Sequence, residues 1–133
     1  MKLIDDEYYI KFEGEEEIDF IYEKNKAEIS RMKIWHGYFY FLLNGMITKE
    51  KKLIGLLYEH NKHEGWYESD EPWEIPDIKQ AIEQFNNYSE NNFSENEKPS
   101  EGILLKLPHI LEKILKFLEE ARKNNGEVYM EYL

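Results

Sequence analysis

Two histidines three positions apart, flanked by carboxylates, form the pattern in this chain that most resembles a metal site. His60 and His63 stand between Glu59 and Glu64. A spacing of three places two side chains on one face of a helix, and zinc accepts imidazole and carboxylate ligands. A zinc site needs further ligands, however, and the alternative is two solvated histidines at a helix end or loop before Gly65. A small metal-dependent hydrolase that uses His60, His63 and nearby carboxylates is therefore an alternative hypothesis, and our main expectation is that the protein holds no metal.

The segment 64–77 combines two tryptophans, one tyrosine and six carboxylates between glycine and proline residues. Tryptophan and tyrosine anchor protein interfaces, and carboxylates attract lysine and arginine on a partner. We therefore expect the partner-binding residues to be Glu64, Trp66, Tyr67, Glu68, Asp70, Glu71 and Glu74. The competing interpretation is that Trp66 and Trp73 face the core, and for Trp73 we expect this, because it lies three residues before a predicted helix start.

Carboxylates are so frequent that the sequence cannot select a catalytic pair among them. General acid–base catalysis needs two carboxyl groups whose environments separate their pKa values. The chain contains no nucleophile elbow, no phosphate-binding glycine loop, no His-Glu-x-x-His helix and no dinucleotide fingerprint. We expect no catalytic residues and no cofactor.

The composition is that of one folded domain over residues 1–133. Hydrophobic residues make up 41% and aromatic residues 15% of the chain, which is enough apolar surface for a core. Cysteine is absent, which favours a reducing compartment. Acidic residues appear in the first seven positions, where a signal peptide would need an apolar segment, and the longest nearly uncharged stretch, 34–48, is too short and polar for a bilayer. We expect a soluble cytoplasmic protein.

The net charge of −11 is distributed unevenly along the chain. Residues 1–23 have a net charge of −7, residues 24–52 of +5, residues 53–77 of −6 and residues 78–133 of −3. Nucleic acid and anionic membranes would be repelled, so we expect neither as a partner, whereas a basic protein would be attracted. The alternative is that the charge serves solubility alone. We also expect part of the acidity to pair with the basic segment inside the fold.

The N-terminal half predicts a hairpin followed by a helix. Alternating apolar residues indicate strands over 2–12 and 18–22, joined at Gly14 into a β-hairpin over 2–24. Helical spacing of Met32, Trp35, Phe39 and Leu42, with Asn44-Gly45 as a stop signal, favours a helix over 26–44. The run at 38–41 favours a strand instead, and residues 53–58 fit either structure.

The C-terminal half predicts two helices and a final strand. We expect a loop over 61–76, a helix over 76–88, a mobile loop over 89–101, a helix from Pro108 to Asn124, and a strand over 127–133. Together these elements predict an α+β fold, with a small antiparallel sheet and two or three packed helices.

These features resemble bacterial immunity proteins of toxin–immunity systems, including contact-dependent growth inhibition. The resemblance rests on small size, acidity, the absence of cysteine, and the segments Trp73-Glu74-Ile75, Leu107-Pro108-His109-Ile110 and Val128-Tyr129-Met130-Glu131-Tyr132. It implies a protein that binds a cognate toxin domain, often a basic nuclease, and blocks its active site. A third hypothesis is an accessory or homo-oligomeric structural protein that pairs through an edge strand or the aromatic residues of 26–44.

Overall fold

The computed structural model describes residues 3–47, 55–62 and 72–133, with residues 59–62 described by their backbone alone. The strands are β1 (Leu3–Tyr8), β2 (Glu17–Lys24), β3 (Ala27–Trp35), β4 (Trp73–Glu74) and β5 (Glu127–Tyr132). The helices are α1 (His36–Asn44), α2 (Gly55–Lys62), α3 (Ile78–Phe85) and α4 (Glu101–Lys123), with one 3₁₀ turn, η1 (Glu90–Asn92).

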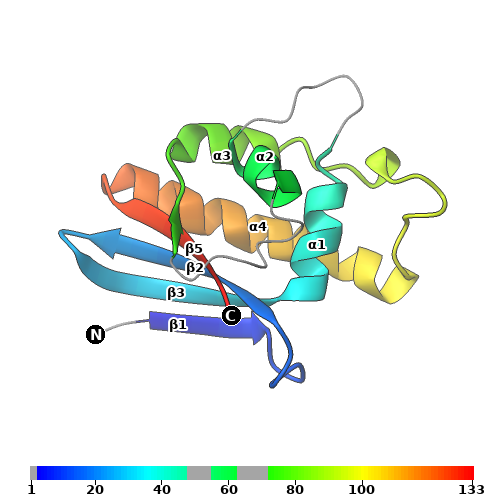
Figure 1. Cartoon of the computed structure of the whole chain (residues 1–133), viewed down its shortest axis with the longest axis horizontal. Helices are drawn as coiled ribbons and strands as arrows, with labels where there is room; N and C mark the ends of the chain where they lie inside the picture. Colours follow the sequence, from blue (N-terminus) through cyan, green and yellow to red (C-terminus); the bar gives the residue numbers. More distant parts are fainter. Residues whose placement is uncertain (1–2, 48–54, 63–71) are drawn as a thin grey trace.

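The strands form one five-stranded sheet in the order β1-β3-β2-β5-β4. Strand β1 runs parallel to β3, and the other neighbours are antiparallel. The helices gather beside one face of this sheet (Figure 1). The predicted α+β class is therefore confirmed, in a single domain, although the sheet is mixed rather than antiparallel throughout.

The core lies between the sheet and helices α1 and α4. In β2, alternate side chains point into it, because successive residues of a strand face opposite sides of a sheet. Phe20, at the centre, is fully buried and meets the rings of Phe39 and Phe85 edge-on, with centroids 5.8 and 6.2 Å apart. Ile21, next to Phe20, is buried as well, yet it lies outside this core cluster.

Helix α4 spans the whole length of the sheet's inner face and begins earlier than its sequence predicts. The expected start at Pro108 is wrong, because the helix begins at Glu101 and contains Pro108 in its interior. A proline inside a helix costs about 3 kcal/mol. That cost is offset by the first two turns of α4, where Ile103, Leu104 and Leu107 pack on the core.

The predicted hairpin over 2–24 is wrong, and the true hairpin joins β2 to β3. Its two-residue turn is Asn25-Lys26, with φ values of 54° and 65°. Two successive positive φ values are typical of the type I′ turn, whose twist suits a tight hairpin. The predicted helix over 26–44 is therefore wrong for residues 27–35, which form β3, and right for residues 36–44, which form α1.

The remaining predictions hold in part. Residues 55–62, left open or expected as a loop, form α2, and the predicted helix over 76–88 is shorter, as α3. The segment 89–101 contains η1 and packs Phe93 against the core, so it is a partly ordered connection whose mobility stays a prediction. No helix in the described part of the chain is both long and apolar enough to cross a membrane.

Candidate protein-binding face of the sheet

The face of the sheet turned away from the core is predominantly acidic. We call it the outer face. The register places Asp19 opposite Lys33 and Glu131, and Ile21 opposite Arg31 and Tyr129. The described strands β2, β3, β5 and β4 contribute seven carboxylates to the outer face, from Glu17, Asp19, Glu23, Glu28, Glu74, Glu127 and Glu131, and two central bases, Arg31 and Lys33.

Arg31 is held at the centre of the outer face by three carboxylates. Its Nη1 donates to Asp19 Oδ2 at 2.6 Å and to Glu131 Oε1 at 3.0 Å. Its Nη2 and Nε donate to the two oxygens of Glu28, at 2.9 and 3.3 Å. Such two-pronged pairs are strong and directional. The pKa of Arg31 is raised, with the Glu28 hydrogen bond as the largest cause, so this base is already occupied.

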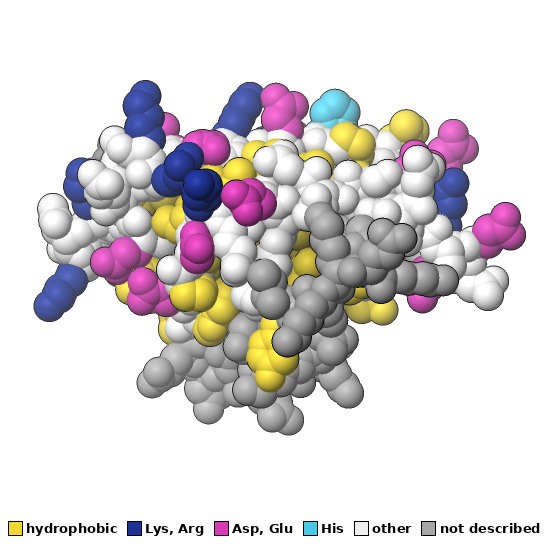
Figure 2. All heavy atoms as spheres, turned by 90° about the horizontal axis from the view of Figure 1, so that it is seen from above, with side chains coloured by type: hydrophobic (Ala, Val, Ile, Leu, Met, Phe, Trp, Pro, Cys, Tyr) yellow, Lys and Arg dark blue, Asp and Glu magenta, His cyan; other side chains and the backbone are white. Residues whose placement is uncertain are grey.

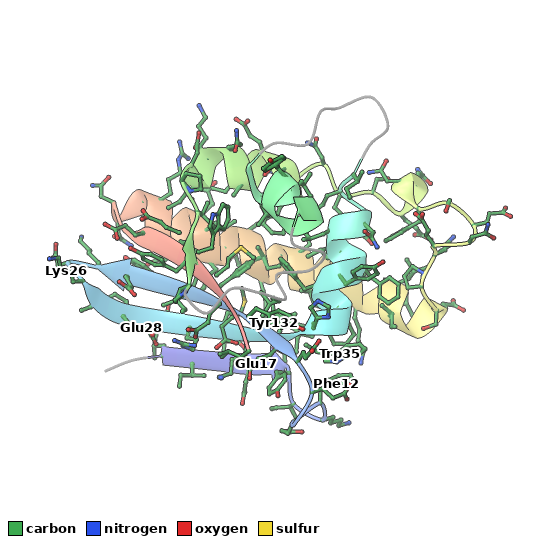
Figure 3. All side chains as sticks on the ribbon, viewed as in Figure 1. Phe12, Glu17, Lys26, Glu28, Trp35 and Tyr132 are labelled. Carbon is green, nitrogen blue, oxygen red and sulfur yellow. The ribbon has the colours of Figure 1, made fainter. Side chains whose placement is uncertain are left out.

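Lys33, the second base, is occupied in the same way. Its Nζ lies 3.1 Å from Glu17 Oε2 and 3.5 Å from Asp19 Oδ2. Figure 3 shows Glu28 toward the hairpin end, marked by Lys26, and Glu17 toward the opposite end, so the ion pairs extend along the strands. The expectation that part of the acidity pairs with the basic segment is confirmed here.

Asp19 is a carboxyl group with no exposed surface. Burial, the largest cause, and the neighbouring Glu17 raise its pKa to about 7, against the opposing effect of Arg31. Its Oδ1 accepts no hydrogen bond from a described residue. If Asp19 is protonated, its carboxyl O–H can donate a hydrogen bond to a carboxylate oxygen of Glu17.

Three further carboxylates surround Tyr129 at the β5–β4 side of the outer face. The Tyr129 hydroxyl donates to Glu127 Oε2 at 2.9 Å, and Glu74 is its direct neighbour on β4. The Glu127 hydrogen bond, desolvation and the negative charges of Glu74, Glu127 and Glu23 raise the pKa of Tyr129 to about 12. Strands β2, β5 and β4 thus each contribute one carboxylate around a half-buried aromatic ring. We call Tyr129, Glu23, Glu74 and Glu127 the Tyr129 cluster.

Elsewhere, the visible charges are mixed. Seen from the top of Figure 1, acidic and basic side chains are interspersed across the surface that is described (Figure 2). On α4, for example, Lys116 pairs with Glu112 and Arg122 with Glu119. Among the described residues, the Tyr129 cluster stands out because three carboxylates surround one tyrosine and none of them forms an ion pair with a described base.

Of the expected partner-binding residues, the structure places Glu74 in the Tyr129 cluster, exposed on β4. The other six expected residues, Glu64, Trp66, Tyr67, Glu68, Asp70 and Glu71, lie outside the described residues. Trp73 packs against the core from the opposite side of β4, as expected. His63 also lies outside the described residues, and His60 is in α2 with its side chain not described.

Sequence reasoning missed the other members of this face, although one signal was present. The alternation over 127–133 separates Val128, Met130 and Tyr132 from Tyr129 and Glu131, so it predicts that the last two share a face. It could not indicate that Glu23 and Glu74 lie beside them, because that depends on which strands pair.

Among the described residues, we find no group of side chains suited to holding a metal ion. Within residues 3–47, 55–62 and 72–133, no three histidine, aspartate or glutamate side chains are grouped in a way that would hold a metal ion. The alternative hypothesis of a metal site at His60 and His63 stays untested, since their side chains are not among those described.

Comparisons with known proteins found no match for this chain: no protein-family model matches it, and neither a curated protein nor a solved structure does.

Proposed function

We propose that this protein is an acidic binding module that recognises a basic protein domain through its outer face. The observation that supports the proposal best is the Tyr129 cluster. Three carboxylates from three adjacent strands meet there around one aromatic side chain, and the two central bases of the same face are already engaged by other acids.

The chemistry of this cluster suits lysine and arginine side chains. Carboxylates held close together repel one another, and a cation placed among them relieves that repulsion. Tyr129 adds an aromatic ring, which offers apolar contact to the methylene stem of a lysine or the plane of a guanidinium group. Tyrosine is also among the residues that contribute most to binding energy at interfaces.

The partner we propose is a toxin domain, and the protein is its immunity protein. A domain that acts on nucleic acid presents a basic surface to its substrate. An acidic face that covers such a surface blocks access of the polyanion, and the opposite charges increase the association rate. Acidity, small size and the absence of cysteine agree with this role.

The segment before β4 extends the proposed interface along the chain. Glu64, Trp66, Tyr67, Glu68, Asp70 and Glu71 precede Glu74 by three to ten positions. We propose that these residues bind the same partner, with Trp66 and Tyr67 as anchors and the acids as charge partners.

The test is a titration with the C-terminal domain of each protein encoded next to this one. We expect one of these domains to bind in isothermal titration calorimetry and to lose its toxic activity when bound. Reversal of the described acids of the cluster, Glu23→Lys, Glu74→Lys and Glu127→Lys in one variant, should weaken binding by about a hundredfold, since each close charge pair contributes on the order of 1 kcal/mol or more.

A matched control separates the cluster from net charge alone. The variant Glu83→Lys, Glu95→Lys and Glu97→Lys reverses three exposed acids elsewhere and changes the net charge by the same six units, from −11 to −5. We expect its affinity to stay within about threefold of the original protein, since distant exposed charges are screened. Equal loss in both variants would refute the role of the cluster, and absence of binding by either neighbour would refute the immunity proposal.

A further inference from the structure

Strand β1 is an edge of the sheet with an unusual surface. It pairs with β3 on one side and with no described strand on the other. Leu3 and Ile4 are 64% and 56% exposed, although they are apolar and adjacent in the strand. Exposed edges present unpaired backbone N–H and C=O groups, and proteins usually protect them with charges, prolines or bulges. Here, Leu3 and Ile4 place one exposed apolar side chain on each face at the start of the edge, before the acids of the same strand begin at Asp5.

A groove lies at the same edge, between β1 and α4. It has a volume of about 540 Å³, and its apolar wall includes Leu3, Met32 and Phe117. The three bases that line it are already paired. Lys113 contacts Asp5 and Glu7, Lys116 contacts Glu112, and Arg31 is held by the carboxylates described above. The groove therefore offers an apolar pocket to one side chain of a strand laid along the start of β1.

The open length of the edge is short and has a defined end. The backbone N–H of Glu7 donates to Asp5 Oδ1 at 3.2 Å, so that amide is already satisfied by the strand's own side chain. Beyond it, the amides of Tyr9 and Ile10 turn back to the Asp6 carbonyl. The part of β1 that can receive a new strand is therefore Leu3–Asp6.

Charge determines which occupant fits. From residue 3 to residue 17, the chain has seven carboxylates, of Asp5, Asp6, Glu7, Glu13, Glu15, Glu16 and Glu17, and one base, Lys11. Asp5 and Glu7 share the single charge of Lys113, and Glu17 pairs with Lys33, so this stretch keeps an excess of negative charge. A second copy of β1 would bring Asp5 and Asp6 against the same acids, which is destabilising when like charges lie opposite each other. In a strand where lysine or arginine alternates with apolar residues, the basic side chains would face carboxylates and the apolar side chains would face the groove.

We propose that the edge of β1 receives an extended segment of the basic partner, in which basic and apolar residues alternate, as an added strand of the sheet. The proposal rests on the proposed function for the identity of the partner, and it adds the mode of binding. The partner's backbone hydrogen-bonds to the alternate N–H and C=O groups of Leu3–Asp6 that point away from β3, and one apolar side chain enters the groove beside Phe117.

The first experiment uses a defined probe in place of the partner. The isotope-labelled protein is titrated with a capped Lys-Val-Lys-Val-Lys-Val peptide, and amide exchange and methyl signals are followed by NMR. We expect the amides within Leu3–Asp6 that point away from β3 to exchange at least about tenfold more slowly, and the methyl signals of Leu3 and Ile4 to shift. A peptide with proline at the central valine should produce neither change, since it cannot complete the strand pairing.

Matched variants test the side chains. Leu3→Ala with Ile4→Ala should weaken peptide binding by about tenfold, through lost apolar contact. Leu105→Ala with Leu133→Ala removes two similarly exposed apolar side chains, 67% and 52% exposed, on α4 and after β5, and should have no effect. Equal binding of both peptides, or shifts confined to the Tyr129 cluster, would overturn the proposal. So would a dimer in sedimentation equilibrium that Leu3→Ala with Ile4→Ala dissociates, because a second copy would then occupy the edge.

This proposal and the proposed function can fail separately. If the neighbour-encoded domain binds the Leu3→Ala, Ile4→Ala variant with unchanged affinity, the strand-addition proposal is wrong and the acidic face stands. If no neighbour-encoded domain binds the original protein, the immunity proposal is wrong, and the peptide titration still decides whether the edge accepts a basic strand.

Discussion

Asp19 shows how the outer face combines burial with charge. It is surrounded by Arg31, Lys33 and Glu17 and has no exposed surface, so its ionised form is disfavoured despite the two bases. The described ion pairs at the centre of this face join two bases, Arg31 and Lys33, to the four carboxylates of Glu17, Asp19, Glu28 and Glu131. Protonation of one of these carboxyl groups lowers the excess of negative charge.

This environment predicts a specific pH dependence of stability. The folded protein holds the Asp19 proton up to about pH 7, whereas the unfolded chain releases it near the ordinary value of 3.8. The stabilisation from this group is therefore complete below about pH 4 and is lost as the pH rises toward 7. Relative to Asp19→Asn, which cannot ionise, the original protein should lose up to ~1.4 kcal/mol of unfolding free energy per pH unit in this interval.

Urea denaturation at pH 5, 6 and 7 measures the effect. Asp6→Asn is the control, because Asp6 is exposed on β1, and its curve should run parallel to that of the original protein. A curve for Asp19→Asn that is also parallel would show that Asp19 titrates normally. A relative gain in stability of the original protein with rising pH would mean that Arg31 dominates and holds the Asp19 pKa low.

At the scale of elements, the short helix α3 depends on the residue that immediately precedes it. Asp77 is its N-cap, and its Oδ1 accepts a hydrogen bond from the Gln80 backbone N–H at 3.0 Å. An eight-residue helix is marginal without packing and capping. Asp77→Ala should lower the free energy of unfolding by about 1 kcal/mol, while Asp77→Asn should retain most of the cap. Equal midpoints for the two variants in urea denaturation would contradict this role.

The elements differ in how well the sequence predicts them, and the reason is the distance over which their signals act. The apolar stripe of α4 and the alternation of β5 are local patterns, and both elements are found near their predicted positions. Strand β3 was missed because its turn, Asn25-Lys26, lacks the glycine that usually marks a type I′ hairpin. Residues 38–41 form a helix despite their preference for strands, because Tyr38 and Phe39 are buried against the sheet.

The pairing of β1 with β3 could not be predicted, since a parallel neighbour depends on contacts that no local pattern encodes. The same limit applies to the candidate site. The sequence indicated Glu74 and the shared face of Tyr129 and Glu131, but the convergence of Glu23, Glu74 and Glu127 follows from strand order alone.

At the scale of the whole molecule, the fold pairs part of its charge and leaves the rest concentrated. Arg31 and Lys33 of the basic segment neutralise acids from both ends of the chain, so the basic segment does not form a separate basic surface at the centre of the outer face. The Tyr129 cluster lies beside these pairs on the same side of the sheet. A negative field in this arrangement extends from the outer face toward an approaching partner.

The measurement that tests this account most directly is the association rate of the neighbour-encoded domain as a function of salt. The Debye length falls from about 30 Å at 0.01 M to about 8 Å at 0.15 M ionic strength. The account predicts that the rate constant decreases by about tenfold or more over this range, and that Glu23→Lys, Glu74→Lys, Glu127→Lys removes most of this dependence. A rate that is independent of salt, or that the reversed and control variants change to the same extent, would contradict recognition through the outer face.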